Sequence, residues 1–167
     1  LGVNGIAGDL VQAPSPAPST EYRLNIEGPF VRVQRLTAGD GQQYFVATDK
    51  SGTTYSFGQT AASRVVDPAN AARIFKWGLD RVEDRDGNYL TVSYTKDQNQ
   101  MYLDEIAYAG NGSTTPTNVV TFHLEARPDT QALYVPNFKV VTAKRLKSID
   151  VQANSSRVRA YQVTYAS

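Results

Sequence analysis

The sequence predicts an all-β fold, in which consecutive antiparallel hairpins form a curved sheet or a sandwich of about eight to ten strands. Ten tyrosines and six phenylalanines accompany many valines and threonines, which are residues that favour strands. Short runs in which apolar and polar residues alternate recur along the chain, and this period of two is typical of half-buried strands. Clusters of Gly, Asp, Asn, Ser and Pro separate the runs and predict turns.

The clearest hairpin signal lies at residues 75–94, FKWGLDRVEDRDGNYLTVSY. Two alternating runs flank Asp86-Gly87-Asn88, and Gly87 supplies the positive φ that a tight turn requires. We expect one long hairpin whose apolar faces form the central cluster. That cluster consists of Phe75, Trp77, Leu79, Leu90, Val92 and Tyr94.

The chain divides into two parts at residue 20. Residues 1–20 end in APSPAPST, a run that favours extended conformations and predicts a flexible Pro/Ser-rich linker. Residues 21–167 are predicted to form a β-rich structural domain. The opening LGVNGIAGD lacks an initiator methionine, a basic n-region and an apolar h-region, so we expect an excised fragment without a signal peptide. No apolar run approaches the ~18 residues of a membrane-spanning helix.

From Glu21 the strand signals follow one another, with predicted turns at 28–29, 37–41 and 49–52. The alanine-rich segment after Asp67-Pro68 favours a short helix or an ordered loop near 68–73, so the fold contains at most one short helix.

After the central hairpin, we expect a turn at 96–100, a polar loop at 111–118 and an irregular segment at 129–138. The last predicted hairpin turns at 154–156, and the three-residue spacing of Leu146 and Ile149 suggests a bulge. Residues 48–57 and 83–92 share the pattern Asp-x-x-Gly followed by alternating strand residues, which indicates a repeated hairpin unit.

Charge and cysteine content exclude several kinds of site. Seventeen basic and sixteen acidic residues are interspersed and give a net charge of +1, which argues against a nucleic acid or an anionic membrane surface as the main partner. The chain contains no cysteine, so a disulfide, a thiolate zinc site and a cysteine nucleophile are excluded.

The only histidine, His123, falls with Thr121 and Glu125 on the polar face of a predicted strand. No G-x-S-x-G nucleophile elbow accompanies it, and a histidine metal site would lack a second histidine or a cysteine. We interpret His123 as a strand-surface residue.

Carboxylates gather in the central hairpin, at Asp80, Glu83, Asp84 and Asp86. The segment DRDGN resembles the start of a calcium loop, but its glycine comes two positions early and the closing glutamate is missing. Turn formation explains these residues without a metal. Asp104 and Glu105 are neighbours on a strand and point to opposite faces, so they cannot flank one glycosidic bond.

Three further groups of residues are candidate binding sites. The glycines of GVNGIAG (2–8) lack the strand and Lys-Ser/Thr of a phosphate-binding loop. A basic cluster interleaved with Asp150 could bind an anionic partner, but a solvated strand face is the simpler interpretation; it comprises Lys139, Lys144, Arg145, Lys147, Arg157 and Arg159. Aromatic rings could stack on sugars or pack in the core; they are Trp77, Tyr89, Tyr94, Tyr102 and Tyr108. The sequence therefore predicts no catalytic, metal-binding or cofactor-binding residue and no cofactor.

An ordered set of segments resembles a known family. The segments are EGPFVRV (27–33), 64–94, YLDEIAYAGN (102–111), EARPD (125–129), KRLKSIDV (144–151) and VRAYQVTY (158–165). They resemble the amino-terminal region shared by B components of bacterial insecticidal toxin complexes and SpvB-type virulence proteins, which adjoin the Rhs/YD-repeat superfamily.

The resemblance implies a non-enzymatic, β-rich part of a hollow shell that encloses a toxic carboxy-terminal segment. It implies a secreted or cell-surface bacterial protein whose partners are other segments of its parent or subunits of a toxin complex. The alternative from another class is a carbohydrate-binding or surface-adhesion module that uses exposed aromatic side chains to bind glycans. An enzyme is the third possibility.

Overall fold

The computed structural model describes residues 2–3, 6–14, 16, 20–26, 28 and 30–166. Strands, and no helices, form the regular structure of these residues. The strands of the main sheet are β3 (Leu10–Gln12), β4 (Glu21–Leu24), β5 (Arg32–Thr37), β6 (Gln43–Thr48), β7 (Thr54–Phe57), β10 (Leu79–Glu83), β11 (Asn88–Asp97), β12 (Gln100–Asn111), β13 (Asn118–Leu133), β14 (Val140–Ala153) and β15 (Ser156–Gln162). Two small antiparallel pairs complete the set: β1 (Gly2–Val3) with β2 (Ile6–Ala7), and β8 (Arg64–Asp67) with β9 (Asn70–Trp77).

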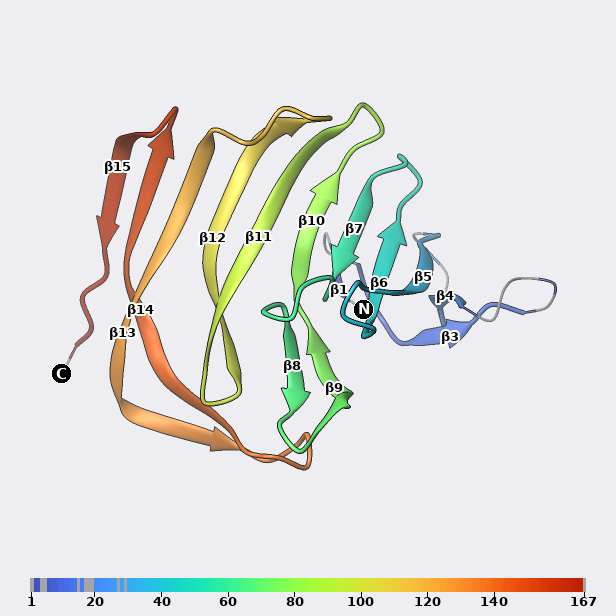
Figure 1. Cartoon of the computed structure of the whole chain (residues 1–167), viewed down its shortest axis with the longest axis horizontal. Coiled ribbons are helices and arrows are strands. Elements are labelled where there is room, and N and C mark those ends of the chain that lie inside the picture. Colours follow the sequence, from blue (N-terminus) through green and yellow to red (C-terminus); the bar gives the residue numbers. More distant parts are fainter. Residues whose placement is uncertain are drawn as a thin grey trace.

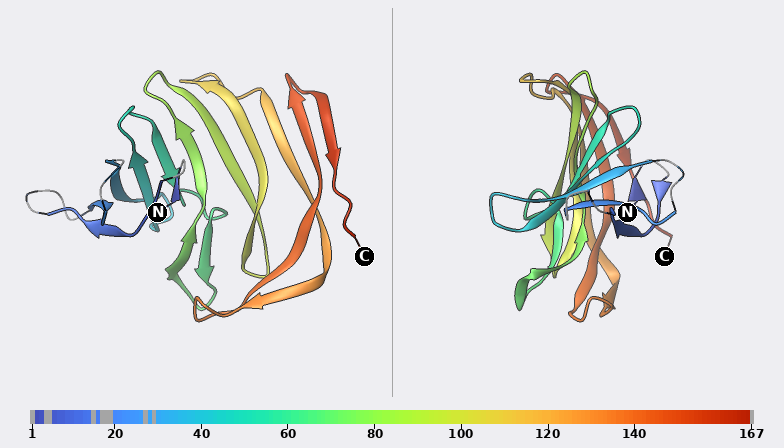
Figure 2. Two further views of the ribbon diagram at one scale, coloured as in Figure 1. Left: turned by 180° about the vertical axis from the view of Figure 1, so that it is seen from behind. Right: turned by 90° about the vertical axis from the view of Figure 1, so that its right-hand side faces the viewer.

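The main sheet is antiparallel throughout, in the order β15-β14-β13-β12-β11-β10-β7-β6-β5-β4-β3. Figure 1 shows it as a curved sheet whose long strands β11–β14 stand side by side. Seen edge-on in Figure 2, the strands from β10 to β15 form one layer. The predicted all-β fold and the curved sheet of antiparallel hairpins are confirmed.

Two hairpins repeat the same turn, as the sequence pattern predicted. In the turn after β6, Oδ1 of Asp49 accepts the amides of Ser51 (2.9 Å) and Thr53 (3.1 Å). In the turn after β10, Oδ1 of Asp84 accepts the amides of Asp86 and Asn88, both at 2.9 Å. Each turn ends in a glycine with positive φ, the left-handed position of a three-residue hairpin loop.

Two other hairpins close through two-residue turns. Gln98 and Asn99 join β11 to β12 with φ of 48° and 65°, and Asn154 and Ser155 join β14 to β15 with φ of 49° and 63°. Two successive positive φ values twist the backbone in the sense that antiparallel strands need. The predicted turns at 96–100 and 154–156 are confirmed.

The central hairpin is shorter than predicted. It closes at Gly87 as expected, but its first run breaks at Gly78, so that β10 pairs with β11 while β9 leaves the sheet to pair with β8. The amide of Gly78 donates to the carbonyl of Ser63 (2.6 Å), and the carbonyl of Gly78 accepts from Gly58 (2.8 Å). Alternation continues across this break, which is why the sequence pattern did not reveal it.

Of the two structures predicted near 68–73, a short helix or an ordered loop, the helix does not form. Pro68 and Ala69 instead form the turn of the β8–β9 hairpin, in which Asp67 and Asn70 face each other. Oδ1 of Asp67 accepts the amide of Ala69 (2.9 Å), which fixes the turn. This local bond and the strand pairing override the weak helix propensity of the alanines.

The irregular segment predicted at 129–138 is partly wrong, because β13 continues to Leu133. The pairing of β13 with β14 shifts between Ala126 and Gln131, and Pro128 lies in that irregularity, where its missing amide costs no ladder bond. The bulge predicted near Leu146 and Ile149 is confirmed, since the register also shifts where β14 passes Lys147.

Ordered strands also occur in the segment predicted as a linker. Leu10–Gln12 pair with β4 as the edge strand of the main sheet. Strand pairing therefore begins before Glu21, while the division of the chain into a linker and a domain remains a prediction. The pattern GVNGIAG spans residues 4 and 5, which lie outside the described residues.

The buried core lies at the β5–β7 end of the sheet. Its buried members are Val31, Val33, Ala47, Tyr55 and Phe57. Of the predicted central cluster, Trp77 and Leu79 pack against this core, whereas Phe75 is 43% exposed and Leu90, Val92 and Tyr94 are half-buried on β11. The cluster was misplaced because β9 turns away from the sheet.

Candidate functional site

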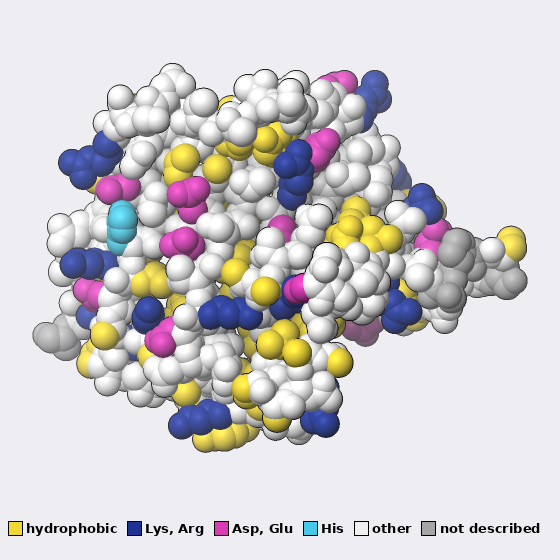
Figure 3. All heavy atoms as spheres, in the orientation of Figure 1, with side chains coloured by type: hydrophobic (Ala, Val, Ile, Leu, Met, Phe, Trp, Pro, Cys, Tyr) yellow, Lys and Arg dark blue, Asp and Glu magenta, His cyan; other side chains and the backbone are white. Residues whose placement is uncertain are grey.

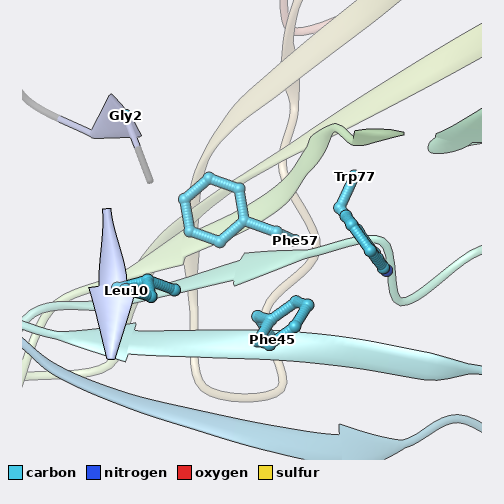
Figure 4. A pocket seen from close by; sticks show the side chains of 5 residues that line it. All are labelled: Gly2, Leu10, Phe45, Phe57 and Trp77. Atoms are coloured by element: carbon cyan, nitrogen blue, oxygen red, sulfur yellow. The ribbon is translucent and has the colours of Figure 1, made fainter. Parts of the chain in front are cut away.

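An aromatic pocket opens beside the core. It has a volume of about 350 Å³ and is lined by Gly2, Leu10, Phe45, Phe57 and Trp77, which come from five different strands. Figure 4 shows the rings of Phe45, Phe57 and Trp77 gathered on one side, with Leu10 and Gly2 opposite. The described residues that line the pocket include no titratable side chain, and they can hold an apolar group.

Trp77 determines the shape of this pocket. Its indole packs edge-to-face on Phe45 with ring centroids 5.1 Å apart, and its Nε1 donates to the carbonyl of Gln43 (2.9 Å). Gly58, with φ of 75°, lies under the indole, and a methyl group there would overlap the ring. Trp77 is therefore held in place on the β6–β7 surface, although it belongs to the separate β8–β9 hairpin.

A buried polar junction anchors the β8–β9 hairpin to the sheet. Asp80 on β10 accepts the amide of Gln59 (2.6 Å) and the hydroxyl of Thr60 (3.0 Å). Arg64 is 1% exposed, and its guanidinium forms a bidentate ion pair with Asp40 in the β5–β6 turn. Nε of Arg64 donates to the carbonyl of Thr60 (3.1 Å), so each side of the guanidinium has a partner.

The charges of the junction act on one another. Hydrogen bonds from Arg64 hold the pKa of Asp40 below its usual range. Desolvation, together with the nearby charge of Arg64, lowers the pKa of Lys96 on β11. An open pocket of about 210 Å³ lies here, lined in part by Asp40, Arg64 and Lys96. Because Arg64 is already paired, we interpret the junction as a structural latch.

Another open groove, of about 580 Å³, is lined in part by Arg127 and Asp129 of β13, Arg145 of β14 and Tyr165. Arg127 binds both carboxylate oxygens of Asp129 (3.0 and 2.8 Å), and Arg145 bonds to Glu125 (2.7 Å) while its guanidinium stacks on the ring of Tyr165. The bonds from Arg127 lower the pKa of Asp129. Both arginines are thus neutralised by neighbouring carboxylates.

His123 lies on the strand surface, as the sequence indicated. Its Nε2 is 3.2 Å from Oδ2 of Asp150 on β14, and Figure 3 shows it on the open face of the sheet near acidic side chains. The described residues include no cluster of three or more histidines and carboxylates that could hold a metal.

The carboxylates of the central hairpin do not converge on a common point. Asp80 is buried in the junction, Glu83 bonds to Arg81 (2.8 Å) and Asp84 caps its turn. Bonds from Asn88 and from turn amides lower the pKa of Asp84. The turn interpretation therefore accounts for Asp84. Asp104 and Glu105 are consecutive residues of β12 and form no shared site.

The residues of the basic cluster are spread along β14 and β15. Arg145 is paired with Glu125, Arg157 lies 3.9 Å from Asp150, and Arg159 donates to the hydroxyl of Tyr161.

Four of the five aromatic residues that could stack on sugars instead make contacts within the protein. Trp77 packs on Phe45, Tyr89 stacks under the guanidinium of Arg81, and Tyr94 donates to the carbonyl of Leu79. Tyr102 is buried, whereas Tyr108 is exposed. These five residues do not form one shared aromatic surface. Glycan binding by this chain remains a prediction.

Sequence reasoning missed Arg64 and Asp40. The one available signal is that Arg64 stands between Ser63 and two valines, in a run that is otherwise suited to burial. A charged residue in such a run needs a buried partner, but that partner lies twenty-four positions away in a turn.

Comparison with known proteins matches these features to one family. The family described as Salmonella virulence plasmid 65kDa B protein, SpvB, matches residues 17–127. The mono(ADP-ribosyl)transferases SpvB of Salmonella typhimurium and Salmonella dublin are 24% identical over 141 residues, which cover 74% of this chain and 23% of each relative. The chain thus spans about a quarter of the curated relatives that it matches.

Solved structures share the fold. The N-terminal domain of the effector protein SpvB from Salmonella typhimurium strain LT2 aligns with a TM-score of 0.67 at 16% identity, covering 99% of this chain and 77% of that domain. TcdB2-TccC3 aligns at 0.69 and 12% identity, over 89% of this chain and 10% of that one. The Tc holotoxin pore of Photorhabdus luminescens aligns at 0.71 and 12%, with the same coverages. Since the family match spans most of the chain and the fold agrees, this chain belongs to the SpvB family.

Proposed function

We propose that this chain is a non-catalytic structural module, one segment of the β-walled shell of a large secreted bacterial protein of the toxin or Rhs type. Its partners in this role are other segments of the parent polypeptide or subunits of a toxin complex. The observation that carries the proposal is the single-layered sheet from β10 to β15, which has no second layer to cover it in Figure 2.

The exposed area supports this role. A folded monomer of 18.3 kDa exposes about 8,100 Å² on average. This chain exposes 10100 Å². The surplus of roughly 2,000 Å² exceeds twice the ~800 Å² that each partner contributes to a standard protein interface. A chain with this shape gains stability when neighbouring segments cover it.

The two edges of the sheet support the same role. β3 and β15 are the two edge strands of the main sheet, and among the described residues β15 pairs only with β14, so its outer backbone groups can accept a further strand. β15 is exposed along its whole length. A wall can extend by adding a strand at this edge.

The pairing of polar groups among the described residues supports a structural role. Arg64, Arg127 and Arg145 are each paired with a carboxylate, and Asp49 and Asp84 hold turns. The transferase activity in the relatives' names is, in this proposal, carried by parts of the parent outside this chain.

Hydrogen exchange tests the structural role. Amides of β15 and β3 are expected to exchange more slowly in the intact parent protein than in the isolated chain, because neighbouring segments cover them. Equal protection in both would contradict a role as a wall segment.

A transfer assay tests the absence of catalysis. The isolated chain is expected to transfer no label from an ADP-ribose donor, and the parent carrying His123→Gln is expected to react at the wild-type rate. Transfer by the isolated chain, or loss of transfer on His123→Gln in a protein that remains folded, would show that this chain carries activity.

A further inference from the structure

The tip of the β13–β14 hairpin carries an exposed apolar surface that the structural role does not use. Three consecutive residues project from it: Leu133 is 46% exposed, Tyr134 62% and Val135 72%. Pro136 follows them. In the views of Figures 1 and 2 this tip lies at one extreme end of the molecule, as does the turn of the β8–β9 hairpin. We call residues 133–136 the apolar tip.

The backbone of the apolar tip is suited to an environment poor in water. The amide of Asn137 donates to the carbonyl of Tyr134 (3.0 Å), and Asn137 takes the left-handed conformation that closes the turn. Pro136 has no amide hydrogen to satisfy. The bond from Asn137 and the proline each remove one free amide from the turn, which lowers the cost of taking it out of water.

The β13–β14 hairpin behind the tip carries an excess of basic residues. Residues 130–149 contain no aspartate or glutamate but include Lys139, Lys144, Arg145 and Lys147. The flanking carboxylate of Asp129 is already bound by Arg127, and Arg145 is paired with Glu125. Lys139, three residues after the tip, makes no side-chain ion pair in the described part of the chain. The hairpin thus offers apolar side chains at its end and one lysine without an ion-pair partner close behind them.

We propose that the apolar tip inserts into the interface of an anionic lipid bilayer. Leu133 and Val135 enter the boundary between headgroups and acyl chains, Tyr134 lies at headgroup level, and Lys139 contacts lipid phosphate. Tyrosine suits this position because its ring is apolar and its hydroxyl stays hydrated. Lysines near an anionic surface add electrostatic attraction.

The shape of the tip favours a lipid surface over a protein partner. A stable protein interface needs about 800 Å² from each side, with a packed core. Three side chains on a projecting turn provide much less area, but they fit an interfacial insertion of about 5–10 Å.

A single-site fluorescent label tests the proposal directly. The chain contains no cysteine, so Val135→Cys creates one labelling site for an environment-sensitive dye. Its emission is expected to shift to the blue with vesicles of phosphatidylcholine and phosphatidylserine, and much less with phosphatidylcholine alone. The matched control is Val158→Cys on β15, which is similarly exposed at 59% but far along the sheet, and its emission is expected to stay unchanged.

Vesicle flotation with unlabelled variants supplies the second measurement. Tyr134→Ser with Val135→Ser is expected to lower the bound fraction at least tenfold, whereas Val158→Ser with Tyr161→Ser leaves it unchanged. Lys139→Gln is expected to weaken binding to anionic vesicles about fivefold, the effect of one basic residue at such a surface. All four positions of the double variants are exposed, so folding is retained.

Three results would overturn the proposal. They are failure of the wild-type chain to bind anionic vesicles, equal blue shifts at positions 135 and 158, and equal loss of binding in the tip and control variants. Failure to bind vesicles would leave the tip as a contact for protein.

Discussion

The two ends of the main sheet bury their side chains in different ways. At the β5–β7 end, short strands enclose a core around Val33 and Ala47, and the β8–β9 hairpin packs Trp77 against it. At the β11–β15 end the strands are much longer, yet most of their side chains remain half-buried or exposed. Packing stabilises the first end, whereas the second depends on its hydrogen-bonded ladder and on the covering segments that we propose.

Two phenylalanines provide the strongest test of this difference. Phe57→Ala removes a buried ring from the core and is expected to lower the free energy of unfolding by about 3–5 kcal/mol. Phe122→Ala, on the half-buried face of β13, is expected to cost less than about 2 kcal/mol, because water already reaches that ring. Denaturant titration measures both, and equal costs would mean that the β11–β15 end is packed as tightly as the core.

Two glycines with positive φ sharpen the comparison. Gly58→Ala places a methyl group against the indole of Trp77 in a left-handed backbone, and we expect a cost of about 2–4 kcal/mol. Gly112→Ala, after β12, has φ of 54° but open space around it, so only the backbone term of about 1 kcal/mol applies. Thermal unfolding of the two variants should rank them in this order; the reverse would show that Trp77 can move aside.

The β11–β15 end has one buried polar anchor of its own. The hydroxyl of Tyr102 accepts the amides of Ala143 (2.8 Å) and Lys144 (3.2 Å) and donates to the carbonyl of Val141 (3.3 Å). Tyr102→Phe leaves the two amides without an acceptor and is expected to cost about 1–3 kcal/mol. Faster hydrogen exchange confined to β14 would locate the effect there, and unchanged exchange would remove Tyr102 as the anchor. Tyr94→Phe, whose hydroxyl has one partner, is the control.

The two turns that are stabilised by Asp49 and Asp84 should show the smallest difference in stability. Bonds from Ser51 lower the pKa of Asp49, and bonds from Asn88 lower that of Asp84, relative to the ordinary value of 3.8. A depressed pKa adds stability above the unfolded pKa, and this stability is lost as the pH falls through the folded pKa. The melting temperature should therefore hold above about pH 5 and fall below about pH 4.

Substitution separates the two turns from the rest of the chain. Asp49→Asn and Asp84→Asn should each flatten the acid-side fall in melting temperature. Asp104→Asn is the control, because its side chain accepts no hydrogen bond in the described part of the chain, and a similar flattening there would show that the turns are not the cause.

Local signals predicted the strands and most turns, because each depends on residues close together in the sequence. Gly87, Gly52 and the pair Asn154-Ser155 mark turns by their backbone preferences alone. The break at Gly78 and the latch between Arg64 and Asp40 join residues that are far apart, so no local pattern could indicate them. The helix that was one of two predictions near Ala71 does not form for the same reason, since pairing with β8 outweighs helix propensity.

The surface position of His123 was easier to predict than the position of the core. His123 falls on the polar side of an alternating run, and the structure places it on the strand surface with Asp150 beside it. The aromatic pocket could be found only from the fold, because its lining residues come from five strands between Gly2 and Trp77.

The order of the strands has a consequence for how the molecule is made. Nearly every neighbouring pair in the sheet joins strands that follow one another along the chain, and only β7 and β10 are separated by an excursion. Contacts between residues that are near in sequence form quickly, since little loop entropy is lost in closing them. Each strand can pair with the preceding strand during synthesis. The sheet can therefore form progressively, before the carboxy-terminal end of the chain has been made.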